Sequence, residues 1–373
     1  MSLKNEAPSA FESTKKFYRE YVSDMTRERL EEDFSADTDR LKQLYRKAVG
    51  EEDYSGKKVD IPVHIKIMRL FNTRASRLNP VRRLIFGLSL IGFIVYHLTS
   101  GLFSDLLLPL SFAALIVLLM IELLEKSDAK REIDLARQIQ LSLLPDSEYT
   151  KENLEIHSFA HTALEVGGDY VDTIETKKGT YVIIADVSGK GLSAALYMVR
   201  LQALVHLLLE KNDLNPKELL TELNEYVKSG IKDKTFVTAC AAFFPKKEPW
   251  FTYARAGHNP PLYFNKSKDE VFELRSDGFA LGMTSSKMLT NQLVLKKIKF
   301  NPGDSVIFYT DGLTEARNSY GEQFGMQRLE AILDIYGSLH AKTLLKKVQN
   351  ALEAFINTTK TEDDITFTCV HKP

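Results

Sequence analysis

Acidic residues occur in this sequence at points where apolar runs begin, end or turn. Because sheet edges can bring the ends of distant strands together, these positions could form one site. Each acid alone is equally typical of a turn or a helix cap, so the prediction depends on the whole set. The set consists of Asp169 after two glycines, Asp186 and Asp311 each directly after an apolar run, and the pair Asp363 and Asp364 directly before one.

Carboxylates gathered in this way would repel one another unless a cation neutralised them. Ligands that are all oxygen atoms suit Mg2+ or Mn2+. Two such ions can share a water, lower its pKa and hold a phosphoryl group for in-line attack. The acids therefore predict a site for metal-dependent phosphoryl chemistry.

Other chemistries find less support in the residues. The sequence has two cysteines, which excludes a disulfide scaffold. A cysteine-based phosphatase needs arginine six residues after the cysteine, but Lys246 stands there after Cys240, and Cys369 lies four residues from the end. Both cysteines alternate with apolar residues, which indicates buried packing. The eight histidines lack the spacing of zinc ligands, and His258, in a turn, either contacts substrate or holds its loop, the role we favour.

One motif suggests nucleotide binding. The run Gly189–Ala194 follows an apolar strand, opens a helix and matches the G-x-G-x-x-A fingerprint of dinucleotide sites. A second helix follows the first, however, with no parallel strand to carry a ribose-binding acid. We therefore interpret the glycines as room for a backbone that approaches a metal site.

The composition describes an ordinary globular chain with more than one domain. It has 373 residues, of which 44% are hydrophobic and 27% charged. With 49 basic and 50 acidic residues, the net charge of -1 predicts no nucleic-acid partner.

Residues 150–373 form a catalytic-sized domain in which apolar, β-rich runs alternate with two pairs of helices. Strands that follow one another directly between helix pairs favour mainly antiparallel sheets covered by helices, an α+β fold. We expect strands at Leu154–Ala160, Thr180–Ala185, Phe236–Phe244, Trp250–Arg255, Pro261–Phe264, Leu293–Phe300, Ser305–Thr310 and Ile365–Val370, and helices at Leu192–Glu210, Pro216–Lys228, Met326–Tyr336 and Ala341–Ile356.

A long apolar block indicates a membrane. The 41 residues from Leu84 to Leu124 contain no lysine or arginine, and one helix of that length would be about 60 Å long, twice the hydrocarbon core. Polar residues and Gly101 at its centre predict a transmembrane hairpin over 83–124, with helices at 83–100 and 105–124. Basic residues cluster before it, and the positive-inside rule therefore places both ends of the hairpin in the cytoplasm. A buried hairpin in a soluble domain is the alternative.

The flanks of the hairpin are less informative. Residues 1–80 predict a small cytosolic helical region of unknown role, whose basic cluster either reflects topology alone or contacts anionic lipid. For residues 125–145 we expect a linker helix with a short heptad-like stripe, which consists of Ala129, Ile133, Ala136, Gln140 and Leu143. The stripe fits two alternatives equally well: pairing with a second copy of the helix in a homodimer, or packing on the next domain. The polar Gln140 would weaken the homodimer.

With these motifs in order, the chain resembles the metal-dependent PPM-type serine/threonine phosphatases, and within them the bacterial SpoIIE/RsbU group. The resemblance covers about residues 133–372 and implies an α-β-β-α sandwich, the PPM phosphatase fold, with two Mn2+ or Mg2+ ions between the sheets. The motifs are ARQIQLSLLP at 136–145, VGGDY at 166–170, ADVSGKG at 185–191, ARAGHNPP at 254–261, YTDGLTEA at 309–316 and DDIT at 363–366.

The resemblance also assigns roles to single residues. Asp186 would bridge the two metals, Val187 would offer its backbone carbonyl to one of them, and Asp311 and Asp363 would complete the other. Asp169 would hold a metal-bound water or a further metal. Asp186 and Asp311 would be the residues most closely tied to catalysis.

Three positions leave questions open. Asp363 is chosen over Asp364 because it matches the first residue of the family's final acidic pair. Ser188 stands where many eukaryotic members carry a histidine proposed as general acid, and the segment Thr162–Val166 lacks their phosphate-holding arginine. The resemblance therefore does not identify the proton donor for the leaving group.

In this group the usual substrate is a phosphoserine or phosphothreonine on a STAS-domain anti-sigma-factor antagonist. The resemblance thus predicts a phosphatase in sigma-factor partner switching. A membrane-held pseudophosphatase, which binds its partner without turnover, is the alternative.

Overall fold

The computed structural model describes residues 78–98, 102–143, 148–151, 153–230 and 235–373. The chain divides into two compact units, residues 1–126 and 127–373. Nearly all of the helical region expected at 1–80 lies outside the described residues.

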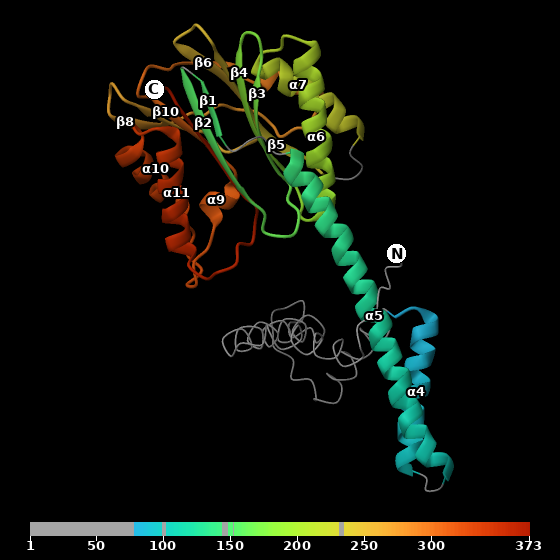
Figure 1. Ribbon diagram of the computed structural model, residues 1–373. Coiled ribbons are helices and arrows are strands. Elements are labelled where there is room, and N and C mark those ends of the chain that lie inside the picture. Colours follow the sequence, from blue (N-terminus) through green and yellow to red (C-terminus); the bar gives the residue numbers. More distant parts are fainter. Residues whose placement is uncertain (1–77, 99–101, 144–147, 152, 231–234) are drawn as a thin grey trace, which may run out of the picture. The chain divides into compact units, whose positions relative to one another are not determined.

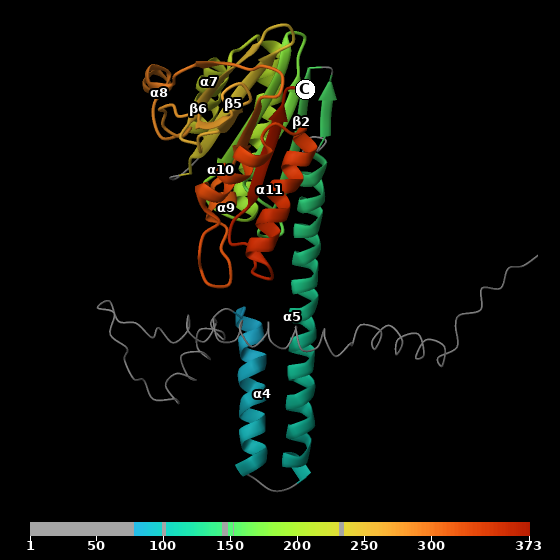
Figure 2. The ribbon, with the colours of Figure 1, turned by 90° about the vertical axis from the view of Figure 1, so that its left-hand side faces the viewer.

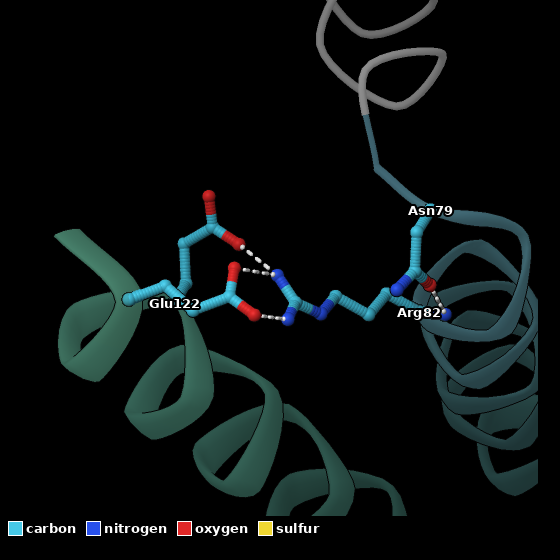
Figure 3. A network of polar contacts seen from close by, with 4 residues as sticks. Asn79, Arg82 and Glu122 are labelled. Atoms are coloured by element: carbon cyan, nitrogen blue, oxygen red, sulfur yellow. Dashed lines mark hydrogen bonds and ion pairs between the residues drawn. The ribbon is translucent and has the colours of Figure 1, made fainter. Parts of the chain in front are cut away.

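The described part of the first unit is a pair of helices, α4 (Pro80–Leu98) and the beginning of α5 (Leu102–Leu143). The helices pack closely where Gly92 meets Ser111, because a Cβ atom at Gly92 would clash with the Ser111 hydroxyl. Near the other end of the pair, Arg82 donates hydrogen bonds to Glu122 at 3.0 Å and to Glu125 at 2.7 Å. Figure 3 shows the Arg82 side chain pointing toward Glu122. Small residues and a bridging arginine thus hold the two helices side by side.

Large apolar side chains cover the exposed surface of this pair, and Leu110 and Phe112 are 71% and 65% exposed. By length and composition, three described helices could cross a membrane: α4, the Asp105–Ser142 part of α5, and α6 (Leu192–Lys211). The helix α6 differs from the others, because seven of its side chains are buried in the core of the second unit. The apolar hairpin therefore remains the candidate for a membrane segment.

The linker helix expected at 125–145 is not a separate element. The helix α5 continues without interruption from Leu102 to Leu143 and accommodates Pro109 inside it. Residues 125–143 contain no glycine or proline and are rich in good helix formers, so nothing in the sequence ends the helix at the edge of the apolar block.

The second unit contains two antiparallel sheets. The six-stranded sheet has the order β1 (Glu148–Lys151), β2 (Leu154–His161), β11 (Ile365–His371), β10 (Ser305–Tyr309), β7 (Leu262–Asn265) and β8 (Glu270–Glu273). The five-stranded sheet has the order β3 (Asp169–Glu175), β4 (Gly179–Val187), β5 (Val237–Pro245), β6 (Trp250–Ala256) and β9 (Lys296–Lys299).

Helices cover the outer face of each sheet. In Figures 1 and 2, α6 and α7 (Pro216–Gly230) lie against the five-stranded sheet, while α10 (Gly325–Tyr336) and α11 (Ala341–Ile356) lie against the other. Two short helices, α8 (Ser286–Gln292) and α9 (Asp311–Glu315), complete the unit. This arrangement confirms the α-β-β-α sandwich.

The strand β4 shows why the sequence folds into layers. Its residues Tyr181, Ile183 and Ala185 pack in the core beneath α6, while Val182 and Ile184 pack in the core between the sheets. Because successive side chains of a strand point to opposite faces, a strand buried on both faces reads as one continuous apolar run. The third core lies between the six-stranded sheet and α10 and α11.

The expected helices and most expected strands are present, with small shifts at their ends. The strand expected at Leu293–Phe300 is shorter, because α8 continues to Gln292 and β9 begins at Lys296. The strands β1, β3 and β8 and the helices α8 and α9 were not expected. Of these, β3 matters most for the site, because it begins at Asp169.

Candidate active site

The strands β3 and β4 bring the first two acids together. Asp169, the first residue of β3, is the cross-strand partner of Asp186 near the end of β4. Directly paired residues of an antiparallel ladder point to the same face, so the two carboxylates face the same side of the sheet. The Gly167–Gly168 turn leads into this pair, as the sequence suggested.

Asp311 and Asp363 come from the opposite sheet. Asp311 follows β10 and begins α9, and Asp363 precedes β11, the neighbour of β10. Gly312 is required here, because a Cβ atom at this position would overlap the backbone carbonyl of Asp364. The two sheets thus contribute two acids each at the same end of the sandwich.

These acids lie close enough together to shift one another's pKa values. Burial, followed by the charges of Asp311, Asp363 and Asp364, raises the pKa of Asp186 to about 7. Burial and the charge of Asp186 raise the pKa of Asp169 well above its usual range. The pKa of Asp311 is raised by burial and by Asp363. The group therefore carries more negative charge than its surroundings stabilise.

Thr310 connects the two sheets within the site. Its buried hydroxyl donates to the Asp169 carboxylate at 2.8 Å, and the same oxygen accepts from the Thr366 backbone N–H at 3.1 Å. The Asp169 side chain is thus held by a residue that directly precedes Asp311 in the chain. Sequence reasoning missed this role, although Thr310 stands inside the YTDG motif.

Asp364 has a different environment from Asp363. Its carboxylate accepts hydrogen bonds from the backbone N–H groups of Ala163, at 2.8 Å, and Gly168, at 2.7 Å. Burial raises its pKa, and these hydrogen bonds oppose the shift. Asp364 therefore fastens the turn that precedes Asp169, while the Asp363 carboxylate lies 2.9 Å from the Lys190 ammonium.

Gln140 fastens the same turn from the other side. Its side-chain amide donates to the Gly167 carbonyl at 2.6 Å and accepts from the Gly167 N–H at 3.1 Å. The side chain is buried, and Ile133 and Ala136 are half-buried on the same stripe. At this end, the stripe packs on its own domain, which is one of the two alternatives that the sequence left open. The homodimer stays a prediction.

The backbone at Val187 and Ser188 is also fixed. The Val187 N–H donates to the Gly168 carbonyl at 3.3 Å. The Ser188 hydroxyl accepts from the Phe236 N–H at 2.9 Å, and the Ser188 N–H donates to the Phe236 carbonyl at 2.9 Å. Ser188 therefore ties the end of β4 to the beginning of β5.

His258 holds its loop, the role favoured from the sequence. The ring is buried, its Nδ1 atom lies 2.9 Å from the Thr238 hydroxyl, and its backbone carbonyl accepts from Arg255. Burial, helped by the Arg255 charge, lowers the pKa of His258 to about 3. The ring is neutral at physiological pH and bonded within the fold.

The rival chemistries do not fit the fold. The strand β4 that precedes the Gly189–Ala194 motif pairs antiparallel with both neighbours, so the parallel βαβ unit of a dinucleotide site is absent there. Cys240 and Cys369 are fully buried, and burial raises the pKa of the Cys240 thiol to about 12. Both cysteines pack in the core and make poor nucleophiles.

The donor atoms fit Mg2+ or Mn2+, because carboxylates and the nearby Val187 carbonyl offer oxygen alone. Within the described ranges, no group of three or more His, Cys, Asp or Glu side chains lies close enough together to hold a metal ion.

The second unit has the PP2C fold. The second unit is similar to the SiaA PP2C domain of Pseudomonas aeruginosa, with a TM-score of 0.57 and 20% identity over 66% of this chain and 98% of that one. It is also similar to the PP2C domain with a regulatory fragment of SpoIIE from Bacillus subtilis, with a TM-score of 0.51 and 14% identity over 61% and 64% of the chains. These likenesses establish the fold.

The family follows from the sequence. Residues 176–373, more than half of the chain, match the model of the protein family described as Stage II sporulation protein E (SpoIIE). The chain therefore belongs to this family. Its relatives include the phosphoserine phosphatase RsbU of Bacillus subtilis, 29% identical over 57% of this chain, and protein IcfG of Synechocystis sp., 28% identical over 65%. The matches span 66% and 41% of those two relatives.

Proposed function

We propose that this chain is a metal-dependent phosphatase that hydrolyses phosphoserine or phosphothreonine on a signalling protein. The observation that carries the proposal is the group of acids at one end of the sandwich, in which burial and like charges raise the pKa of Asp186 to about 7. A group of clustered, partly buried carboxylates is stabilised when cations bind to it. The family and the fold supply the reaction class, since the RsbU relative is named a phosphoserine phosphatase.

The proposal assigns the metal ligands as the resemblance implied. Asp186 would be shared by two Mn2+ or Mg2+ ions, the Val187 carbonyl would contribute to one, and Asp311 and Asp363 would contribute to the other. Asp169 holds a water or a further ion. When bound, the ions neutralise the carboxylates, make a water acidic enough to attack, and stabilise the charge of the phosphoryl group.

The other residues of the site keep these acids in place. Thr310 orients the Asp169 carboxylate, and Asp364 and Gln140 hold the turn before it. Ser188 is bonded to the Phe236 backbone, so it fixes the local backbone at the position where many eukaryotic members carry a histidine. A site fixed before the substrate arrives loses little free energy to reorganisation during the reaction.

The substrate is proposed to be a STAS-domain antagonist of an anti-sigma factor. The named relatives RsbU and RsbP of Bacillus subtilis are both phosphoserine phosphatases. A solved structure with 23% identity and a TM-score of 0.50 joins RsbU and RsbW domains in one Mycobacterium tuberculosis protein. Partner switching, in which dephosphorylation changes which protein a regulator binds, is the setting that these relatives support.

The apolar hairpin is proposed to anchor the chain in the inner membrane, with residues 1–80 and the catalytic unit in the cytoplasm. Cysteines introduced at Ser2 and Gly101 of a chain lacking Cys240 and Cys369 should then react with an impermeant reagent from opposite sides. Labelling of both positions from the cytoplasm alone would contradict the hairpin.

Phosphate release tests the proposed activity directly. The full-length protein is purified in detergent and incubated with a phosphoserine STAS protein, with Mn2+ or with a chelator. We expect release that requires the metal, and none from a matched phosphotyrosine peptide. If candidate phosphoproteins bind without any metal-dependent release, the chain is the pseudophosphatase of the alternative.

A further inference from the structure

Lys190 lies beside the acidic segment that precedes β11. It stands in the loop between β4 and α6, flanked by Gly189 and Gly191 with φ angles of 107° and 73°. These left-handed conformations, which suit glycine, turn the loop toward the segment before β11. There the Lys190 ammonium lies 2.9 Å from Asp363 Oδ2 and donates to the Glu362 carbonyl at 2.7 Å. One loop of the five-stranded sheet thus reaches the acidic loop of the other.

The ammonium is also the positive charge that acts on Asp186. Its charge opposes the rise in the pKa of Asp186, whereas the other leading charges on Asp186 are all acids. Around Asp169, Asp311 and Asp364, the leading opposing contributions come from hydrogen bonds. Among the described residues that act most strongly on these acids, Lys190 is therefore the one that attracts an anion into the site.

The position leaves room for a ligand. The Lys190 side chain is 52% exposed, and a Cβ atom at Gly189 would meet nothing within 4 Å. An ammonium has three N–H donors, and the two contacts with Asp363 and Glu362 use two of them. One donor remains for a group that approaches from the solvent.

We infer that Lys190 binds the phosphate group of the substrate and orients it over the acids, an inference that rests on the proposed phosphatase function. If Asp363 serves as a metal ligand, the metal neutralises part of its negative charge. Asp363 then balances the charge of Lys190 less well, and a second anion can bind to the ammonium. A phosphate oxygen supplies that anion, and lysine is an effective point-charge partner for phosphate. The segment Thr162–Val166 contains no arginine, so a cationic side chain that holds phosphate would have to come from another part of the chain.

A purely structural role makes different predictions. If Lys190 only fixes the loop that carries Asp363, its removal should misplace a metal ligand and weaken metal binding. If Lys190 binds phosphate, its removal should weaken phosphate binding and leave metal binding as strong or stronger, because a positive charge near the cations has gone.

The test compares the full-length protein with Lys190→Met and Lys190→Arg. Lys247→Met is the matched control, since Lys247 is an exposed lysine in the loop between β5 and β6. Four quantities are measured: KM and kcat for p-nitrophenyl phosphate, inhibition by inorganic phosphate, Mg2+ affinity by calorimetry, and Tm. Inorganic phosphate binding by calorimetry in Mg2+ gives a readout that needs no turnover.

We expect Lys190→Met to raise KM and to weaken phosphate binding by about tenfold each, the size of one lost charge-assisted hydrogen bond. Lys190→Arg should restore both to within about threefold, and Lys247→Met should match the native protein.

An unchanged KM and phosphate affinity in Lys190→Met would overturn the inference, as would a loss that follows weaker Mg2+ binding and a lower Tm. A native protein that neither releases phosphate nor binds it would instead overturn the proposed function, and the inference with it.

Discussion

The two ends of the β sandwich carry opposite arrangements of charge. At the end where β4 finishes, Asp186 faces other acids, and burial together with their repulsion raises its pKa to about 7. At the end where β3 finishes, Glu175 accepts a hydrogen bond from Lys151 at 2.6 Å and pairs with Lys246 at 3.1 Å. Those two lysines lower the pKa of Glu175.

The difference shows that the acidic end, and not the Glu175 end, lowers the stability of the fold. Charge at the Glu175 end is cancelled locally, as on most protein surfaces, and exposed pairs of this kind contribute little to stability. Charge at the acidic end is concentrated and partly buried, which destabilises the fold unless a cation or a proton binds. Clustered charges with shifted pKa values are typical of binding and catalytic sites. The predictions below test this contrast, from the largest expected effect to the smallest.

Replacing Asp311 with asparagine should have the largest effect. The change keeps the shape of the side chain but removes one charge from the acidic group, so metal affinity and turnover should fall by at least about a hundredfold, more than for a residue that only supports a ligand. In a chelator the same variant should be no less stable than the native protein, because a repulsion has been removed. Calorimetric Mn2+ titration, phosphate release and Tm measure the three effects.

Near-normal activity of Asp311→Asn at limiting Mn2+ would remove Asp311 from the set of ligands. Glu315→Gln is a suitable comparison, because Glu315 lies in the same helix as Asp311 and raises its pKa, but has no assigned ligand role. It should change turnover far less.

Stability without metal should fall as the pH rises. The folded state raises the pKa of Asp186 to about 7, so the folded protein binds a proton that the unfolded chain releases nearer pH 4. The resulting stabilisation is complete below about pH 4 and is lost as the pH rises through about 7. Allowing for partial exposure, we expect a loss of about 2 kcal/mol, or about 5 °C in Tm.

Calorimetry in a chelator between pH 5 and pH 8 measures this slope. Asp186→Asn should flatten it, and Mg2+ added at pH 8 should restore the lost stability of the native protein. A Tm independent of pH in the chelator would show that the acids do not strain the metal-free fold.

Gln140→Leu tests how the turn before Asp169 is supported. Leucine cannot bond the Gly167 N–H and carbonyl, and leaving buried backbone groups unpaired should cost about 2 kcal/mol. Denaturant unfolding of the full-length protein measures the loss, with the exposed Gln138→Leu as control. A more stable variant that sediments as a larger species would indicate that this residue lies in a helix-pairing interface instead.

The acids of the site could be predicted from the sequence because their signal is local. Asp186 lies near the end of an apolar strand and Asp311 comes shortly after another, and a strand buried on both faces can be recognised as a continuous apolar run. The supporting residues could not be predicted, because Thr310 and Gln140 act through partners 141 and 27 residues away in the chain. Only the folded chain brings these partners together.

The strand β3 was missed for a related reason. Its sequence, DYVDTIE, contains three acids, yet Asp172 is buried and accepts a hydrogen bond from the Tyr170 hydroxyl at 2.8 Å. His206 of α6 lies 2.7 Å from the same carboxylate. A buried acid satisfied by partners elsewhere in the chain breaks the alternation on which strand prediction depends.

Lys151→Met should have the smallest effect and complete the contrast between the two ends. The variant removes one of two lysines from Glu175, and the remaining Lys246 still balances the exposed carboxylate. We expect Tm to change by no more than about 2 °C and phosphate release to stay at the native level, because solvent screens exposed pairs. The pH dependence should also have the opposite sign to that of the acidic end: since the pKa of Glu175 is lowered in the fold, its contribution is present near neutral pH and is lost as the pH falls through that lowered value. Tm measured from pH 3 to pH 8 in low and high salt tests both points, and a change in activity as large as that of Asp311→Asn would mean that the two ends are coupled.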